Sequence, residues 1–374
     1  MPDRAATIAE GLRSNIETCA DEIDEARKLP DELVAALKQA GAFRLLIPAS
    51  LGGLETPLPD FLDAVQIYAE ADASTAWCIT QGAVIGTTTG WLEPEVAREI
   101  WQDPDAAIAN GPPGKCVATD CGDHHLLTGR WGFSSGCRHA SWMIGVAPLD
   151  DKSGWVSAFF PVDVPAFHDT WQVQGLRGTG SFEFSVEDLK VDRRWLANIA
   201  KPANHDNEFF KIPTGLVFAV GFASVALGVA RAGLDATIAI AQGKVPRFRS
   251  TSLKDDGDVQ KMMGEAEIRW RAAHAFLHET VADVWQGLAS QDDISKTQRI
   301  ALRMAGTHVI REAAVVLDIG YTVTGSTSIY RENPLQRRFQ DMHVITQHVQ
   351  ARLSHYGYVG RHFLGHDYEP GPLS

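Results

Sequence analysis

The stretch GLVFAVGFASVALGVA (residues 215–230) runs for sixteen residues without a charged side chain. It is rich in glycine and alanine and ends at Arg231. A membrane-spanning helix needs about 20 consecutive apolar residues, so this run is too short for a span. We therefore predict a helix that is buried in a bundle and has close neighbours.

Long helical patterns continue on either side of this stretch. Apolar residues recur at helical spacing over residues 215–242, 258–288, 295–321 and 334–357, and short polar loops separate these segments. Four such helices predict a C-terminal four-helix bundle, which we place at residues 209–374.

The two regions that precede the bundle differ in their sequence patterns. Residues 1–105 show helical patterns, with helices predicted at 32–41 and 61–71. Residues 106–208 contain short strand-like runs separated by Gly, Pro and Asp turn signals. These runs are 126–131, 141–148, 155–160 and 182–191. The predicted fold is α+β and mostly α: an N-terminal helical domain, a central antiparallel β barrel or sandwich, and the C-terminal bundle.

Composition excludes several classes of partner. The formal net charge is −13, and no block of Lys and Arg occurs, which argues against nucleic acid and against a polybasic membrane anchor. The first residues lack the apolar segment of a signal peptide. The five cysteines are scattered and odd in number, which is not a disulfide framework. We expect a cytoplasmic protein.

Three short motifs invite functional interpretations. Residues 132–136 match G-x-S-x-G, but a hydrolase elbow needs a helix after the turn, and residues 141–146 have strand character. A connection between strands and a ligand-facing loop both remain open. Residues 178–181 are a tight turn without a helix behind it. The remaining cluster fits no usual zinc spacing, so we predict no metal site; it contains Cys116, Cys121, His124 and His125.

Two histidines lie in the last helical segment. Residues 333–334 (Asn-Pro) form a good helix start, and on an unbroken helix His343 lies beside the apolar stripe while His348 lies on the far face. The β-branched run at residues 344–346 is a weak point, and a break there would let His348 face inward. A histidine suits proton transfer near neutral pH, although a bond to a backbone carbonyl or to water is the alternative for both.

Six segments, spread in order along the chain, carry a family resemblance. They resemble acyl-CoA dehydrogenases, and more closely a branch of that superfamily, the two-component flavin monooxygenases. That branch includes p-hydroxyphenylacetate hydroxylase oxygenases, hydroxysecosteroid hydroxylases and dibenzothiophene monooxygenases. The segments are AFRLLIP running into GGL (42–54), ADASTAW (71–77), NGPPG (110–114), GRWGFSSG (129–136), GLRGTGS (175–181) and FQDMH running on to QH (339–348).

The resemblance implies where a flavin binds. The segment Phe133, Ser134, Ser135 and Gly136 resembles the dehydrogenase segment that lies against the flavin ring, which makes Ser135 the expected partner of flavin N5 and Ser134 a backbone contact. The turn that supports the flavin would then comprise Gly178, Thr179 and Ser181.

The flavin phosphate is a separate question. Arg247 or Arg249 would contact it, although the usual Arg-x-x-Phe-Gly pattern is absent here, and a solvated surface loop is the alternative.

The catalytic base is where the chain departs from the dehydrogenases. Many of them use a glutamate in a Tyr-Glu-Gly-Thr segment, seven or eight residues after an Arg-Asp pair. The same distance from Asp341 leads to His348 and Val349, with no carboxylate in reach. An acyl-CoA α proton needs a desolvated carboxylate, whereas an imidazole with a pKa of about 6.5 can deprotonate or polarise a phenol. The resemblance therefore implies His348 as the catalytic group, with His343 as the second choice.

The implied reaction is an oxygenation. Reduced FMN or FAD would come from a separate NAD(P)H-flavin reductase, since no nicotinamide-binding G-x-G-x-x-G is visible. Oxygen would add at flavin C4a to give a hydroperoxide, which Ser135 would stabilise, and His348 would deprotonate or orient the hydroxyl of a small aromatic substrate. Transfer of the oxygen to carbon, nitrogen or sulfur stays open. Candidate substrate contacts are Trp77, Gln81, Trp91 and Asn110.

Two other functions remain open for this sequence. The first alternative is an acyl-CoA dehydrogenase or related flavin oxidase, in which Glu265, Glu267 or Glu332 serves as a displaced base. The second is a superfamily member that binds flavin or CoA without turnover. The superfamily resemblance also implies a homotetramer.

Overall fold

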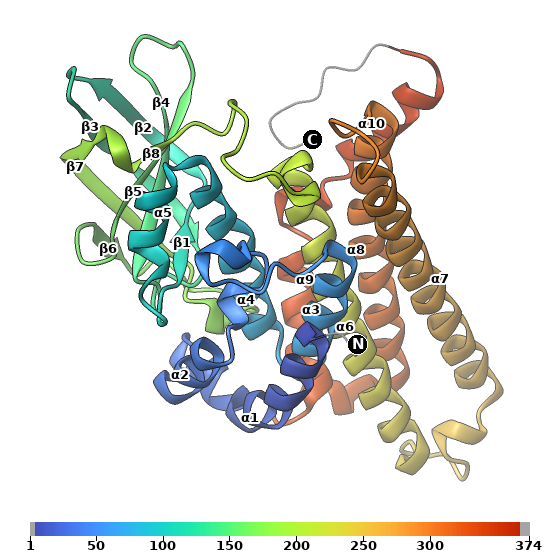
Figure 1. Cartoon of the computed structure of the whole chain (residues 1–374). Coiled ribbons are helices and arrows are strands. Elements are labelled where there is room, and N and C mark those ends of the chain that lie inside the picture. Colours follow the sequence, from blue (N-terminus) through green and yellow to red (C-terminus); the bar gives the residue numbers. More distant parts are fainter. Residues whose placement is uncertain (1–3, 367–374) are drawn as a thin grey trace. The chain divides into compact units, whose positions relative to one another are not determined.

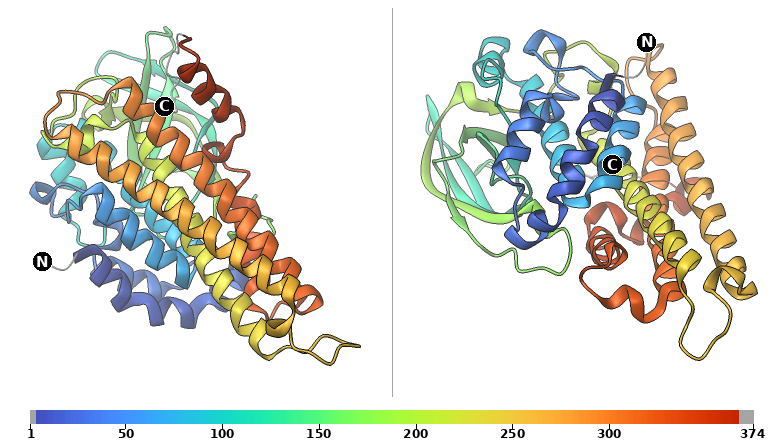
Figure 2. Two further views of the ribbon diagram at one scale, coloured as in Figure 1. Left: turned by 90° about the vertical axis from the view of Figure 1, so that its right-hand side faces the viewer. Right: turned by 90° about the horizontal axis from the view of Figure 1, so that it is seen from below.

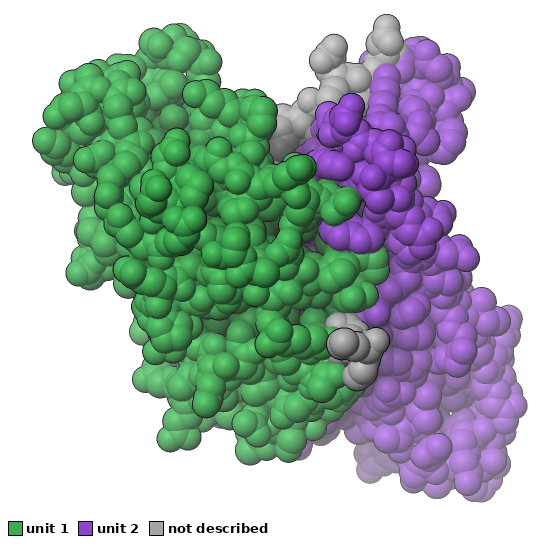
Figure 3. Space-filling view, in the orientation of Figure 1, with its two compact units in different colours: residues 1–61, 77–173, 177–210 green, residues 62–76, 174–176, 211–374 purple. Residues whose placement is uncertain are grey.

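The computed structural model describes residues 4–366 and divides the chain into two compact units. Unit 1 comprises Met1–Phe61, Trp77–Val173 and Arg177–Phe210, and unit 2 comprises Leu62–Ala76, Gln174–Leu176 and Lys211–Ser374 (Figure 3). Each unit is described by itself below. The three predicted domain ranges (1–105, 106–208 and 209–374) stay a prediction.

Unit 1 contains the first helices of the chain. The helix α1 buries one side chain every three or four residues, from Ala5 to Ile23, which is the pattern of a helix with one apolar face. The predicted helix at 32–41 is confirmed as α2, which lies one or two residues earlier. The helices of this region are α1 (Arg4–Ala26), α2 (Asp31–Gln39), α5 (Pro94–Trp101) and α4 (Ala73–Gly86), which enters unit 1 at Trp77.

Two four-stranded sheets make up the β region of unit 1 (Figure 1). The first has the order β1-β4-β5-β8 and the second the order β2-β3-β7-β6. The strands are β1 (Ile108–Asn110), β2 (Pro113–Asp120), β3 (His124–Ser134), β4 (Trp142–Pro148), β5 (Trp155–Pro161), β6 (Ala166–His168), β7 (Phe182–Asp192) and β8 (Leu196–Ala197).

The predicted antiparallel sandwich is confirmed, with one exception. All strand pairs are antiparallel except β1 and β4, which run parallel. Buried aromatic rings fill the interior: Trp131 and Phe184 stack at 5.0 Å between ring centroids, and Phe160 meets Phe184 edge-on. This rigid β core fixes the end of β3, where the predicted flavin segment begins.

Unit 2 is helical. The long helices α6, α7 and α8 run side by side (Figures 1 and 2), and α6 also packs against α9. The predicted helix at 61–71 is confirmed as α3, which starts three residues earlier. The helices are α3 (Leu58–Ala71), α6 (Thr214–Gly243), α7 (Gly257–Leu288), α8 (Lys296–Thr324), α9 (Pro334–Ile345) and α10 (Ser354–Phe363).

The apolar stretch that opened the sequence lies in α6. Among the described helices, α6 alone is long and apolar enough to cross a membrane, but 78% of its apolar window is buried inside the structure. Its glycines allow close helix packing: a Cβ on Gly228 would lie 2.4 Å from the backbone oxygen of Gln66 in α3. The prediction of a buried bundle helix with close neighbours is confirmed.

The last predicted helix, 334–357, is wrong as one continuous element. The helix α9 ends at Ile345, a 3-10 helix η9 covers Val349–Ala351, and α10 begins at Ser354. The break falls on the β-branched run, where the Thr346 hydroxyl donates to the backbone oxygen of His343 at 2.8 Å. That hydrogen bond offers the backbone an alternative to the helical ladder. The fourth element of the predicted bundle is therefore two helices with a kink at His348.

Candidate active site

A bulge at the end of β3 shapes the predicted flavin segment in unit 1. The pairing of β3 with β7 shifts register between Trp131 and Ser134, and Phe133 takes a positive φ of 52°. This backbone conformation is disfavoured for a bulky side chain and costs on the order of 1 kcal/mol or more. Phe133 is 67% exposed, and its ring lies edge-to-face with Trp171 at 6.0 Å between centroids.

A chain of buried hydroxyl groups lies directly behind this bulge. Ser135 Oγ and Ser181 Oγ are 2.7 Å apart, and Ser181 Oγ lies 2.7 Å from Thr179 Oγ1. The backbone N–H of Gly136 also donates to the Thr179 carbonyl, at 3.1 Å. The structure therefore brings together the two segments, 133–136 and 178–181, that the resemblance assigned to one flavin site.

Trp77 sets the hydrogen-bonding capacity of Ser135. Its indole N–H donates to Ser135 Oγ at 3.1 Å, and an indole N–H cannot accept. When Ser135 donates its own proton to Ser181, one lone pair of its oxygen stays available for another donor. The role of Trp77 as a substrate contact stays a prediction.

These residues fit a flavin ring. Reduced flavin presents an N–H that needs an acceptor, which the second lone pair of Ser135 could supply, and a planar face that the exposed Phe133 side chain could cover. The buried Ser134 hydroxyl has no hydrogen-bond partner among the described residues and faces Gly111, so its side chain points into the sheet. This agrees with a backbone contact for Ser134.

The other predicted substrate contacts have different environments. Gln81 Nε2 donates to Asn110 Oδ1 at 2.7 Å, so these two half-buried carboxamides form a pair. Trp91 donates its indole N–H to the Lys201 backbone oxygen at 2.7 Å and packs edge-on against Phe210. That bond already uses the one polar group of Trp91, whereas the carboxamide pair retains donors and acceptors for a ligand.

In unit 2, His343 forms an ion pair at the surface. Its Nε2 lies 3.0 Å from Asp318 Oδ1, and both side chains are partly exposed. The ring also contacts Phe339 edge-on at 4.4 Å. This arrangement links α9 to α8 and gives His343 a structural partner.

We expect His343→Gln to leave product formation within about twofold of the wild type, because exposed ion pairs contribute little. Steady-state assays with saturating reduced flavin measure this. A loss as large as that of a His348 variant would contradict the assignment.

His348 lies at the kink between α9 and η9, also in unit 2. Its Nδ1 accepts a hydrogen bond from the backbone N–H of Gln350 at 3.4 Å, and its ring meets Phe222 of α6 edge-on at 4.8 Å. Burial, and in second place the Arg352 guanidinium, lowers the pKa of His348 to about 4. Of the two predicted histidines, His348 is thus the one whose ring packs against other parts of the protein, because the helix ends before it.

The predicted phosphate contacts lie in the connection between α6 and α7. Arg247 is exposed and its guanidinium lies over the Phe248 ring, 5.4 Å from the centroid. Arg249 is also exposed and lies 3.7 Å from Asp256. Their role at a phosphate stays a prediction.

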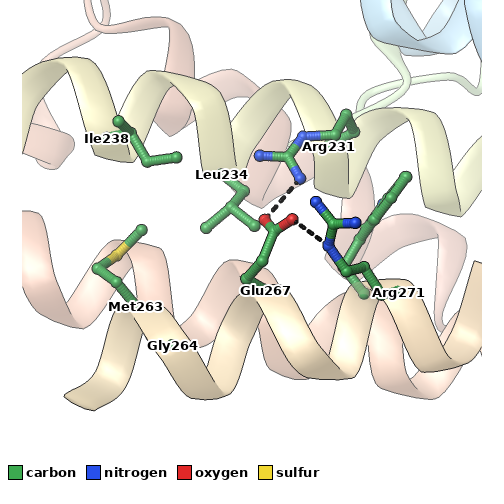
Figure 4. Close-up of a pocket in the computed structure, with 8 residues that line it drawn as sticks. Arg231, Leu234, Ile238, Met263, Gly264, Glu267 and Arg271 are labelled. Carbon is green, nitrogen blue, oxygen red and sulfur yellow. Dashed lines mark hydrogen bonds and ion pairs between the residues drawn. The ribbon is translucent and has the colours of Figure 1, made fainter. Parts of the chain in front are cut away.

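A groove of about 670 Å³ lies between α6 and α7, and Glu267, a candidate base of the dehydrogenase alternative, lines it, whereas none of the residues predicted for the flavin or its substrate does. Figure 4 shows Arg231 and Arg271 pointing toward Glu267 in this groove. Both guanidinium groups bond to that carboxylate and lower its pKa, with Arg231 as the main cause. Glu265 pairs with Arg269. The lowered pKa makes Glu267 a poor base for a weak carbon acid, which disfavours it as a displaced dehydrogenase base.

Comparisons with known proteins agree with this geometry. Two family models match: the acyl-CoA dehydrogenase N-terminal domain over residues 4–91 and the acyl-CoA dehydrogenase C-terminal domain over residues 220–352. An indole-3-acetate monooxygenase from Pseudomonas putida is 32% identical, over 94% of this chain and 91% of that protein. The chain belongs to the flavin-dependent monooxygenases of the acyl-CoA dehydrogenase superfamily.

Further relatives of this monooxygenase support the same family. A flavin-dependent monooxygenase, oxygenase subunit HsaA, from Mycobacterium tuberculosis is 30% identical over 91% of this chain and 90% of that protein. The crystal structure of the HsaA monooxygenase from M. tuberculosis superimposes with a TM-score of 0.91 at 26% identity and covers 99% of both chains. The resemblance to the monooxygenase branch and the dependence on reduced flavin are therefore confirmed.

Sequence reasoning missed two neighbours in this monooxygenase. Phe222 lies in the uniformly apolar stretch of α6, where no single position stands out. The backbone N–H of Gln350, which donates to His348 Nδ1, carries no sequence signal at all.

Proposed function

We propose that this monooxygenase is the oxygenase component of a two-component system. It accepts reduced FMN or FAD from a separate NAD(P)H-flavin reductase and hydroxylates a small aromatic molecule. The observation that carries the proposal is the half-buried imidazole of His348 at a kink. The resemblance implies that this position corresponds to the carboxylate of the dehydrogenases. The name of the P. putida relative favours an indole or a similar aromatic acid as the substrate class.

Bound flavin would supply the activated oxygen atom, and residues of the chain would bind the flavin and orient the substrate. Ser135 would accept the N5 hydrogen through its second lone pair, while Trp77 and Ser181 hold the hydroxyl in place. His348 would contact an oxygen atom of the substrate. The carboxamide pair of Gln81 and Asn110 would orient polar groups of the substrate, and an exposed arginine, Arg247 or Arg249, would bind flavin phosphate.

Isotopic oxygen provides the direct test. The purified protein is mixed anaerobically with photoreduced FMN or FAD and then with ¹⁸O₂, in the presence of indole-3-acetate or simple phenols. We expect one ¹⁸O atom in the organic product by mass spectrometry. Tight FAD that bleaches with acyl-CoA under nitrogen, with no labelled product, would instead establish the dehydrogenase alternative.

Ser135→Ala should uncouple the reaction. Removing one hydrogen bond to the reacting cofactor costs about 1.5–3 kcal/mol, so the yield of product per reduced flavin should fall about tenfold or more, with hydrogen peroxide making up the difference. Product and peroxide are measured together. Ser181→Ala is the matched control, because Ser181 touches Ser135 rather than the flavin in this proposal, and its effect should be smaller. Unchanged coupling in Ser135→Ala would remove Ser135 from the site.

We also propose a cytoplasmic homotetramer. The five cysteines, all within the described residues, form no disulfide, which suits a reducing compartment. Light scattering coupled to size exclusion measures the assembly, and a monomeric mass would contradict it.

A further inference from the structure

The segment that carries His348 is held by one face of α8. This segment, which we call the clasp segment, comprises residues 346–352, and the groups that hold it are Arg303, Thr307 and Arg311, spaced four residues apart on α8. The Arg311 guanidinium donates to the backbone oxygens of Ala351, at 2.9 Å, and Thr346, at 3.2 Å. The Thr307 hydroxyl donates to the Gln350 backbone oxygen at 2.9 Å.

The side chain of Gln350 fixes the same segment from the inside. Gln350 is only 2% exposed. Its Oε1 accepts from the Arg303 guanidinium, and its Nε2 donates to the Gly215 backbone oxygen at 3.0 Å. With both its carbonyl and its carboxamide anchored, residue 350 has one backbone orientation, and its N–H points at His348 Nδ1.

This geometry selects one tautomer of His348. A backbone N–H can only donate, so the Nδ1 that accepts from it carries no proton. A neutral imidazole has one N–H, which must then be on Nε2. The surroundings disfavour a second proton, and the pKa of His348 is lowered to about 4. Arg352 lies within the clasp segment, Arg303 and Arg311 hold it from α8, and His355 follows it at the start of α10.

We propose that His348 acts as a neutral hydrogen-bond donor through Nε2–H, not as a general base, and that Arg303, Thr307 and Arg311 are positioning residues that impose this tautomer. The Nε2–H donates to an acceptor oxygen of the substrate, which belongs to a phenolate or a carboxylate. A neutral donor stabilises such an oxygen without needing a proton from solvent. The inference rests on the proposed function and replaces the base role that the sequence suggested.

A second histidine, His355, contacts Thr307 and provides a comparison for the tautomer of His348. The Thr307 hydroxyl gives its one proton to the Gln350 oxygen, so its contact with His355 Nδ1, at 2.8 Å, requires a proton on that nitrogen. His355 and His348 are therefore expected in opposite tautomers. Both have a pKa lowered to about 4 by burial, so both stay neutral at physiological pH.

Nitrogen spectroscopy tests the tautomer without any turnover. ¹⁵N-histidine protein is sedimented and studied by magic-angle-spinning NMR, with His348→Gln and His355→Gln used to assign the two rings. We expect His348 with unprotonated Nδ1 and protonated Nε2, unchanged between about pH 5.5 and 8.5, and His355 with the reverse. A proton on His348 Nδ1, or a titration near pH 6.5, would overturn the proposal. Thr307→Val and Arg311→Met should mix the tautomers; an unchanged spectrum would remove their positioning role.

Activity then separates a donor from a base. A glutamine at 348 keeps a donor at the far end of the side chain, whereas a glutamate offers only acceptors at neutral pH. We expect His348→Gln to retain product formation within about tenfold of the wild type and His348→Glu to fall to the level of His348→Ala. Higher product formation by His348→Glu than by His348→Gln would instead support a general-base role for His348. If the wild type itself incorporates no ¹⁸O, the proposed function fails, while the spectroscopic result on the tautomer stands by itself.

Discussion

Product formation by the His348→Ala variant is expected to fall by at least about 100-fold, while oxidation of reduced flavin continues. A positioned proton-transfer or hydrogen-bonding group contributes roughly 10²–10⁴ in rate, and alanine removes both ring nitrogens of His348, the group that we propose contacts the substrate. Reduced flavin that reacts with oxygen without a guided substrate releases hydrogen peroxide. Rapid mixing with prereduced flavin, followed by separate quantification of product and peroxide, measures both quantities.

The control for this variant is His343→Gln, which changes the neighbouring histidine on the same helical segment. His343 faces Asp318 at the surface, so its replacement should leave product and peroxide near wild-type values. Thermal unfolding of both variants shows whether the kink at residue 348 still folds. Equal losses in the two variants, or a His348→Ala enzyme with full coupling, would remove His348 from the reaction.

The Gly228→Ala substitution is expected to destabilise unit 2 strongly, although alanine is the better helix former. A Cβ at residue 228 would lie 2.4 Å from the Gln66 backbone oxygen and 2.6 Å from Ala69 Cβ. Helix backbones cannot yield by that much without a shift of α3 against α6, and overpacking of this kind costs about 1–3 kcal/mol. Scanning calorimetry or the half-life at a fixed temperature measures the loss.

The matched control is the same substitution at an open helical glycine. Gly264 lies within α7, and a Cβ there meets nothing within 4 Å. Gly264→Ala should therefore stabilise the protein by up to about 1 kcal/mol through helix propensity alone. Effects of the same sign at both positions would show that the α3–α6 crossing is looser than described.

The sequence by itself determined the features that depend on local pattern. A sixteen-residue run without charge predicted the buried α6, and alternation between turn signals predicted the strands β3, β4, β5 and β7. Six short segments in order determined the superfamily and its branch. The absence of a carboxylate after Asp341 pointed to an imidazole at His348. Each of these signals is carried by residues that are neighbours in the chain, so periodicity and spacing suffice to find them.

Only the tertiary structure decided how these side chains can act. Trp77 and Ser135 are 58 positions apart in the chain, and no local pattern joins them, yet the indole N–H of Trp77 donates to the Ser135 hydroxyl. His343 became a surface group because Asp318 of another helix reaches it. The Nδ1 of His348 accepts a hydrogen bond from the backbone N–H of Gln350 because α8 anchors the backbone of that residue. The direction of each hydrogen bond depends on which groups are neighbours after folding. Because these neighbours are distant in the chain, no local sequence pattern predicts them.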